Sequence, residues 1–265
     1  AIAFKLGAVP FHMWVPDVYD GAPTSVAAFV GTAPKIAAVV FAFRILVTGM
    51  GTIHSDWAPM LAILAVASLV VGNLAAIMQT NIKRMLAYST VSHMGFILLA
   101  FMAGAVGFTA GLYYAITYAL MAAVSFGVLM VLSTKDIECE NIKDLAGLNQ
   151  RHAWFAFLML LSMFSMAGIP PLMGFYAKFG VIMALLKQGH VWLSVFAVIM
   201  SLIGAFYYLR VVKVIYFDAP DHDQPVGSNY AAKFVLTVNA FLLLLWGIMP
   251  QTVIDWCAKA LENTL

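Results

Sequence analysis

The sequence predicts an all-α polytopic membrane protein with about eight transmembrane helices, two of them discontinuous. Of its 265 residues 63% are hydrophobic and only 10% are charged, and its mean hydropathy is +0.95. No soluble domain needs so much apolar surface. The apolar runs are long and do not alternate with polar residues, which excludes a transmembrane β-barrel. Since a spanning helix needs about 20 apolar residues, we expect spans near 1–15, 24–47, 57–78, 82–103, 107–133, 153–188, 191–216 and 231–249.

The first expected span begins at Ala1, already inside an apolar segment. It has no initiator methionine, basic region or cleavage site, so it is not a signal peptide. We expect an N-terminal part to precede it. The segment also contains Gly7, Pro10 and Pro16 around the aromatic run FHMW. Proline removes a backbone donor and clashes with the preceding turn, so a helix break is expected near Pro10.

The run 153–188 is too long for one span. Its 36 residues would make a helix of about 54 Å, against a hydrocarbon core of about 30 Å. Its middle reads AGIPPLMGF, and a discontinuous helix is the natural solution. The residues expected to break it are Gly168, Pro170, Pro171 and Gly174.

Two proline-interrupted helices in corresponding places point to a transport site in a repeat-built transporter. Pro10 and Pro170 are five expected spans apart, and an odd number of spans gives successive units opposite topology. We therefore expect an inverted five-helix repeat. Residues 1–47 would end the first repeat, 57–216 would form the second with its break in 153–188, and 231–265 would be the last helix and a C-terminal tail.

Basic residues predict the orientation in the membrane. Three loops that fall on one side carry eight cations, and the opposite side carries three. The positive-inside rule places the eight-cation side in the cytoplasm and the C-terminus on the non-cytoplasmic side. The eight are Lys83, Arg84, Lys135, Lys143, Arg151, Arg210, Lys213 and Lys233, and the three are Arg44, Lys187 and Lys259.

The other three cations, Lys5, Lys35 and Lys178, lie inside expected spans. A lysine at mid-bilayer costs about 2.5–3.5 kcal/mol, and a lysine removed from water exchanges its proton more readily. Proton carrying is therefore the predicted role of all three. The alternative is that each caps backbone carbonyls freed by a nearby proline. All 12 acidic residues fall in predicted loops or terminal segments, so we expect a carboxylate partner on an upstream helix or a neighbouring subunit.

His93 lies midway along the span 82–103 and is a candidate to pass protons between lysines. Ser89 shares its helix face and Ser92 flanks it. The alternative is a neutral histidine that joins helices through a serine. Tyr114 and Tyr118 are also one turn apart and are candidates to line a water file, although tyrosines often simply pack.

Other kinds of site have no support in the sequence. Its net charge of +2 does not suggest nucleic acid, and no phosphate-binding or dinucleotide motif is present. Cys139 and Cys257 lack metal-ligand spacing, so free thiols and no metal are expected.

Three segments closely resemble the antiporter-like membrane subunits of respiratory complex I. They are FKLGAVPFHMWVPDVYDGAPTSVAAFVGTAPKIAA (4–38), NIKRMLAYSTVSHMGF (81–96) and AGIPPLMGFYAKF (167–179). The resemblance covers the whole chain but only the later part of the family, from its seventh transmembrane helix to its fourteenth. It implies two inverted repeats, each with a broken helix and a proton half-channel, in a bacterial inner membrane.

By motif, Lys5 resembles the lysine of the family's first broken helix, Lys35 that of the following helix and Lys178 that of the second broken helix. His93 takes the place of a central-axis polar residue. The family's glutamate on its fifth helix has no counterpart here. The resemblance also implies that this chain holds no cofactor: NADH, FMN, iron–sulfur clusters and quinone belong to partner subunits. The other membrane subunits, including the sister antiporter-like subunits, and the lipid bilayer are the expected partners.

One departure from the family pattern indicates which branch of the family the chain resembles. The larger antiporter-like subunits carry histidines and lysines on the helix that corresponds to 107–133, whereas this stretch has no basic residue. That argues against those subunits and against the multisubunit sodium/proton antiporters, and water bound by Tyr114 and Tyr118 would replace the missing groups. The rival hypotheses are an antiporter or membrane-bound hydrogenase component, and a structural spacer that conducts no protons.

Overall fold

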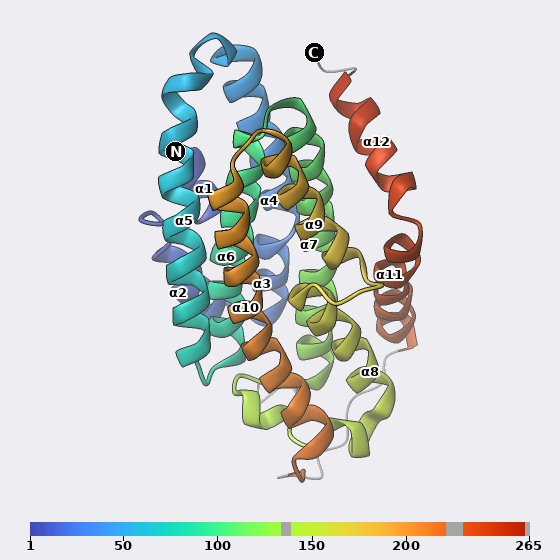
Figure 1. Ribbon diagram of the computed structural model, residues 1–265. Helices are drawn as coiled ribbons and strands as arrows, with labels where there is room; N and C mark the ends of the chain where they lie inside the picture. The colour runs from blue at the N-terminus through green and yellow to red at the C-terminus, as the bar shows by residue number, and fades with distance from the viewer. Residues whose placement is uncertain (134–138, 221–229, 263–265) are drawn as a thin grey trace.

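The computed structural model describes residues 1–133, 139–220 and 230–262. Within these ranges it is helical without any β-strand, apart from one isolated bridge between Asn81 and Asn141, so the predicted fold class is confirmed. Long helices stand side by side in one bundle (Figure 1). The α-helices are α1 (Ile2–Leu6), α2 (Trp14–Gly21), α3 (Thr24–Gly31), α4 (Ala33–Phe43), α5 (His54–Met78), α6 (Ile82–Met102), α7 (Gly104–Leu132), α8 (Leu148–Ala167), α9 (Met173–Lys187), α10 (Val191–Phe217), α11 (Tyr230–Ile248) and α12 (Pro250–Glu262).

Six helical segments in the described ranges are long and apolar enough to cross a membrane. The other two expected spans, 1–15 and 153–188, are each interrupted by a break, between α1 and α2 and between α8 and α9. The count of eight spans and the inverted repeat therefore stay predictions. The six segments are Thr24–Gly49, Gly51–Met78, Ile82–Met102, Gly104–Leu132, Val191–Phe217 and Tyr230–Ile248.

The first break separates α1 from α2. Helix α1 ends at Leu6, and Gly7 follows with φ 77°, a conformation that only glycine adopts freely. Pro16 does not belong to the break as expected, because it lies in the first turn of α2, where the missing N–H has no intrahelical partner to lose. Helix α2 therefore continues to Gly21. It carries Asp17 and Asp20, which the sequence analysis wrongly placed in a loop.

The second break separates α8 from α9. Gly168 has φ 88° and its N–H donates to the carbonyl oxygen of Phe164 at 3.1 Å, which closes the end of α8. Pro170 and Pro171 follow, and α9 begins at Met173. The predicted run of 36 residues thus becomes a 20-residue helix and a 15-residue helix. Each break contains a cis peptide bond before a proline, Val9–Pro10 in the first and Pro170–Pro171 in the second.

The segment 24–47 is part of one candidate span, Thr24–Gly49, as expected, but its helix is interrupted. Helix α3 ends at Gly31, and Thr32 has non-helical dihedral angles, φ −115° and ψ −89°. Pro34 lies in the first turn of α4, where it cannot donate a hydrogen bond back to α3. A π-helical turn, η1 (Arg44–Gly49), continues the segment. Lys35 therefore lies at the start of a helix and not midway along one.

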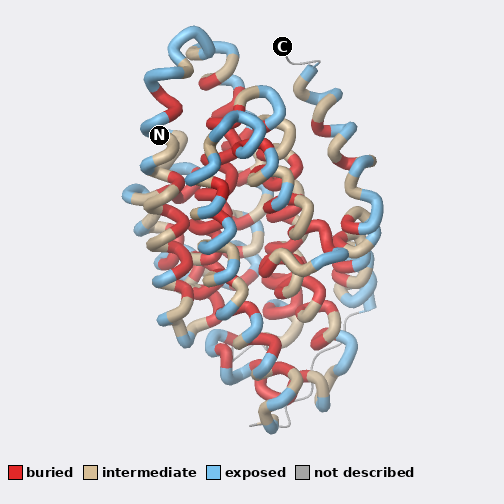
Figure 2. Tube along the Cα trace, viewed as in Figure 1, coloured by how far each residue is buried: buried red, intermediate tan, exposed pale blue. Residues whose placement is uncertain are grey.

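Helix α6 forms the centre of the bundle, and 94% of its spanning window is buried. Figure 2 shows buried residues concentrated along the inner helices and exposed residues on the periphery and α12. Glycines bring α5 against α6: a Cβ at Gly72 would lie 2.6 Å from the Ser92 nitrogen, and one at Gly95 would lie 3.0 Å from the Ala65 oxygen. In a membrane the hydrophobic effect does not drive helices together, so they associate through such close packing of their backbones at small residues.

The predicted basic loops lie at one end of the bundle. Backbone hydrogen bonds join Ile82 N to Glu140 O at 2.7 Å and Gly147 N to Val214 O at 3.3 Å. At the same end the Arg210 guanidinium donates to Ile77 O and Gln79 O, at 2.8 and 2.7 Å, and so caps α5. A short 3₁₀ helix, η3 (Ile142–Leu145), lies between α7 and α8. Lys135 lies outside the described residues.

Gly174→Ala is expected to destabilise the protein by about 1–3 kcal/mol, since overpacking a close contact costs that much. A Cβ at Gly174 would collide with the carbonyl oxygen of Ser165, whose hydroxyl accepts a hydrogen bond from Gly174 N at 3.1 Å. Gly180→Ala on the same helix is the matched control, because its Cβ would meet Ala110 Cβ at an ordinary 3.7 Å. The measurement is the melting temperature in detergent. Equal melting temperatures for the two variants would contradict the prediction.

Candidate functional site

Lys178 binds the carbonyl end of α8 across the second break. Its side chain is only 7% exposed, and its Nζ donates to the Ala167 oxygen at 3.0 Å. The Nζ also lies 5.6 Å from the centre of the Phe96 ring, on its face. The last carbonyls of a helix lack intrahelical partners and carry partial negative charge. An ammonium group placed there is stabilised without a carboxylate.

Lys35 makes the same kind of contact at the first break. It is 1% exposed, and its Nζ donates to the carbonyl oxygens of Leu6 at 2.7 Å and Lys5 at 3.3 Å, at the end of α1. The Nζ lies 5.0 Å from the centre of the Trp14 ring. An aromatic face attracts a cation, more strongly where water is excluded.

Lys35 and Lys178 thus share one arrangement: a lysine, the carbonyl end of a helix that stops at a glycine with positive φ, and an aromatic ring. The hydrogen bonds of both lysines agree with the interpretation that they cap freed carbonyls. Lys5 lies elsewhere, because its side chain is exposed on α1 and only its carbonyl oxygen takes part. Capping and proton carrying are compatible, since a capping ammonium still exchanges its proton.

His93 joins three helices at the centre of the bundle. It is 3% exposed, and its Nδ1 lies 2.8 Å from the Tyr114 hydroxyl on α7. Its Nε2 lies 2.9 Å from the Tyr208 hydroxyl on α10. Tyr208 in turn bonds the Ser89 hydroxyl. The structure therefore brings together the predicted residues His93, Ser89 and Tyr114, and both nitrogens of the histidine are in hydrogen bonds.

A second hydroxyl pair lies beside this network. Tyr118 bonds Thr90 at 2.6 Å between oxygens, and the Tyr118 ring centre lies 5.1 Å from that of His93. Ser125, further along α7, bonds Ser162 at 2.8 Å. Tyr114 and Tyr118, predicted to line a water file, thus both face His93.

A narrow crevice lies between His93 and Lys178, and Ser92 lines it as well. Side chains fill it so closely that it leaves no room for a water molecule. Movement of a side chain or helix is therefore needed before a proton can pass between Lys178 and His93. The break at 168–172 lies directly before the helix that carries Lys178.

Sequence reasoning missed the residues that complete the network. The Tyr207 hydroxyl donates to Asn73 Oδ1 at 3.1 Å and lies 3.4 Å from the Tyr208 hydroxyl. Asn73 Nδ2 donates to Leu69 O and to Met200 O, which ties α5 to α10. A signal was present: Asn73 is the only amide inside the apolar run 57–78, and Tyr207 and Tyr208 are adjacent inside the apolar run 191–216. What was lacking was the information that these helices meet at His93.

The arrangement has the parts of a proton relay. Neutral histidine donates from one ring nitrogen and accepts at the other. A proton taken up at one nitrogen and released at the other would reverse the hydrogen bonds to Tyr114 and Tyr208. The hydroxyls of Tyr208, Ser89 and Tyr207 would then reorient, because each is both a donor and an acceptor.

Comparison with known proteins shows that the chain matches a recognised family. Residues 1–204 match the family model described as NADH:quinone oxidoreductase/Mrp antiporter, transmembrane. The chain is 83% identical over its full length to NADH-quinone oxidoreductase subunit N of Neisseria gonorrhoeae, and it covers 55% of that protein. It is 53% identical over its full length to the subunit N of Nitrosomonas europaea, again covering 55%. The chain thus spans about half the length of the relatives it matches.

Solved structures agree. A chain of respiratory complex I from Thermus thermophilus with bound aureothin superposes with a TM-score of 0.84 and 31% sequence identity, over 96% of this chain and 56% of the other. A chain of the Mrp complex from Dietzia superposes with a TM-score of 0.89 over 99% of this chain and 57% of the other. Its 21% identity supports the shared fold alone.

Proposed function

The chain belongs to the NADH:quinone oxidoreductase/Mrp antiporter transmembrane family, and on that premise we propose that it is part of a proton-translocating membrane subunit of a bacterial NADH:quinone oxidoreductase. The observation that carries the proposal is the pair of buried lysines, Lys35 and Lys178, each held at a helix break with no carboxylate contact among the described residues. A buried lysine without a carboxylate contact is held in its charged form only by dipoles and an aromatic face. Small movements at the break therefore change how readily it binds a proton.

The proposed relay runs from Lys178 through His93 to Tyr208. Beyond Tyr208 it divides, to Ser89 on α6 and through Tyr207 to Asn73 on α5. Opening of the crevice between Lys178 and His93 would complete the path between these two residues. Redox energy released in other subunits would drive that opening and the charge changes of Lys5, Lys35 and Lys178 in turn. Lys5 is included in the proposal because its motif resembles that of the family, although its side chain is exposed.

The organisation of the whole subunit follows as part of the proposal. Residues 1–47 would end one inverted repeat, 57–216 would form the next, and 231–265 would close the subunit. The similar lysine contacts at the two breaks support a repeat relation. We further propose that the end of the bundle with Lys83, Arg84 and Arg210 faces the cytoplasm of a bacterial inner membrane, which puts the C-terminus on the other side.

The partners and cofactors are also part of the proposal. Other membrane subunits of the complex, including the sister antiporter-like subunits, and lipid would surround this chain. NADH, FMN, iron–sulfur clusters and quinone would be bound by partner subunits and not by this chain. The subunit N names of the relatives at 83% and 53% identity favour this assignment over an antiporter or hydrogenase component.

His93→Gln is expected to lower NADH-driven proton pumping by at least about tenfold, since a positioned proton-transfer group contributes about 10²–10⁴-fold. Glutamine retains a donor and an acceptor for Tyr114 and Tyr208 but does not bind a proton at neutral pH. The measurement is acidification of proteoliposomes that contain the whole complex, normalised to assembled complex. His190→Gln, at the turn between α9 and α10 and outside the network, is the control. Pumping by His93→Gln at the parental rate would favour the structural spacer.

A further inference from the structure

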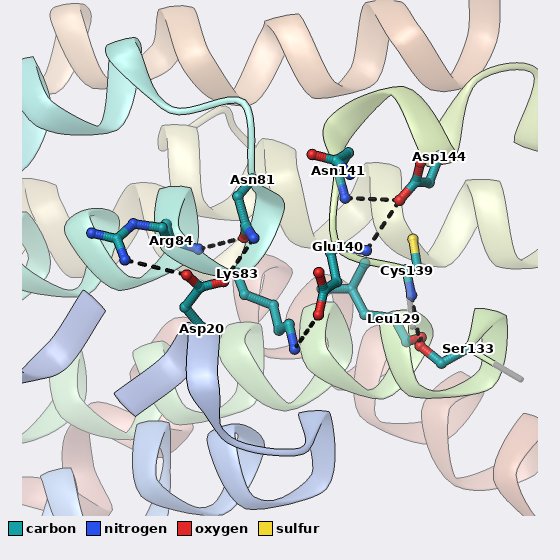
Figure 3. Close-up of polar contacts among 10 residues, drawn as sticks. All are labelled: Asp20, Asn81, Lys83, Arg84, Leu129, Ser133, Cys139, Glu140, Asn141 and Asp144. Atoms are coloured by element: carbon teal, nitrogen blue, oxygen red, sulfur yellow. Dashed lines mark hydrogen bonds and ion pairs between the residues drawn. The ribbon is translucent and has the colours of Figure 1, made fainter. Parts of the chain in front are cut away.

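A third buried lysine lies at the end of the bundle, away from the network of His93 and Lys178. Lys83 was counted as a loop cation, but it lies in the first turn of α6 and is only 1% exposed. Its Nζ is 3.6 Å from Oε1 of Glu140, whose side chain is 48% exposed. Figure 3 shows the two side chains pointing toward each other, Lys83 from α6 and Glu140 from the segment after α7. One partner is thus inside the protein and the other is in contact with solvent.

The segment that carries Glu140 is firmly attached to the α5–α6 corner. Ile82 N donates to Glu140 O at 2.7 Å, and Ile142 N donates to Thr80 O at 2.9 Å. The Asp144 carboxylate accepts from the backbone N–H groups of Glu140 and Asn141, at 3.1 and 2.8 Å. These bonds fix the backbone on both sides of Glu140. The approach of Glu140 to Lys83 is therefore built into the fold.

The neighbouring acids of α2 are engaged with other groups. Asp20 accepts from Asn81 Nδ2 at 2.8 Å and from Arg84 at 3.2 Å, and Asp17 pairs with Arg84 at 3.3 Å. Arg84 does not release its proton at any relevant pH. This second cluster therefore joins α2 to α6 without offering a group that exchanges protons. Lys83 and Glu140 both exchange them.

Hydroxyl groups continue inward from Lys83 toward His93. Thr90 follows Lys83 by seven positions on α6, which is two turns and about 10.5 Å along the same face. Thr90 bonds Tyr118 at 2.6 Å, and the Tyr118 ring packs against His93. The buried Tyr19 hydroxyl on α2 lies close to this pair, so three hydroxyl groups gather at this point of the bundle.

We propose that Glu140 and Lys83 form the water-facing end of a proton path that runs along α6 to His93. This inference rests on the proposed function, because it supplies a solvent connection for the same relay. Lys83 gives a proton from Nζ to water beside Thr90 and becomes a neutral amine. The Glu140 carboxylate then takes a proton from bulk water and passes it to Nζ, which restores the ion pair. Each step breaks one N–H or O–H bond and forms another, and nothing is oxidised or reduced.

Glu140→Gln in the whole complex tests the path, since the amide matches the carboxylate in shape but does not exchange a proton. NADH-driven pumping in proteoliposomes is expected to fall by at least about tenfold. Sodium formate, a small weak acid, is expected to restore part of the rate because Glu140 is accessible to solvent. Sodium perchlorate at equal ionic strength is not expected to restore the rate. Lys143→Gln, an exposed lysine on the same segment, is the control and is expected to pump at the parental rate.

Three outcomes would overturn the path. The first is parental pumping by Glu140→Gln and by Lys83→Met. The second is a loss that formate and perchlorate affect equally, which would make the ion pair structural. The third is an equal loss in Lys143→Gln. Lys178→Met, measured in parallel, separates the two proposals: if it loses pumping while Glu140→Gln does not, only the water-facing end is wrong, and if neither loses pumping, the proposed relay itself fails.

Discussion

Lys178→Met in the intact complex is expected to lower NADH-driven proton pumping by at least about tenfold, because the relay loses a proton-transfer group. Methionine fills a similar volume but neither donates to the Ala167 carbonyl nor carries a proton. Quinone reduction is expected to slow with pumping, since the two are coupled in the proposed function. Pumping and NADH oxidation measured on the same proteoliposomes test this. Lys187→Met, an exposed lysine at the end of the same helix, is the control.

A second variant separates proton transfer from structural support. Losing the hydrogen bond to Ala167 leaves a buried carbonyl without a partner, which costs about 1–3 kcal/mol. Lys178→Arg keeps the charge and the donors, but guanidinium does not release its proton. If Lys178 only caps α8, arginine should restore pumping; if it carries protons, arginine should stay as poor as methionine. Recovery by Lys178→Arg, or full activity of Lys178→Met, contradicts the relay.

Lys35→Met is expected to lower pumping by a similar factor, at least about tenfold, and also to loosen the first break. Its ammonium is bound to the carbonyls of Leu6 and Lys5 at the end of α1, and a helix as short as α1 has little stability of its own. Hydrogen exchange of the backbone amides of residues 5–8 is therefore expected to accelerate. Hydrogen exchange of the same amides is measured in Lys35→Arg. This variant should keep their exchange slow, but the complex that carries it should still fail to pump protons.

Arg44→Gln, an exposed cation at the end of α4, is the control for Lys35. Lys5→Met asks separately whether the exposed side chain takes part, as the family motif implies. Unchanged exchange at residues 5–8 in Lys35→Met would show that the contact with α1 does not hold the break. Unchanged pumping would remove Lys35 from the relay.

Much of the fold was predictable because it depends on local chemistry. Glycine and proline fix where a helix stops whatever surrounds it, so both breaks were found within a few residues. The errors came from where a proline lies in its helix. Pro16 was expected to contribute to the first break, and Pro34 lies inside the expected span 24–47, yet each occupies the first turn of a helix, where a missing N–H costs nothing. As a result, Asp17 and Asp20 lie in helix α2, and Lys35 lies at the start of helix α4.

The site was less predictable because these helices are apolar on nearly every side. In water, an apolar stripe shows which face of a helix is buried. In a membrane every face is apolar, so the pattern does not show which helix meets which. Tyr207, Tyr208 and Asn73 were visible as polar residues in apolar runs, but nothing in the runs showed that α5 and α10 both reach His93. Lys83 was counted as a loop cation for a similar reason: one position into a helix is enough to bury it beneath a neighbouring segment.

The sequence by itself determined the all-helical membrane class, the two breaks, the family resemblance and the presence of three lysines inside apolar runs. It grouped Lys5 with Lys178, since both lie on broken helices, and set Lys35 apart. Only the tertiary structure decided that Lys35 and Lys178 are the matching pair. The reason is physical: a buried ammonium binds the nearest carbonyls without helical partners, and α4 brings Lys35 to the end of α1, while the side chain of Lys5, on α1 itself, is exposed.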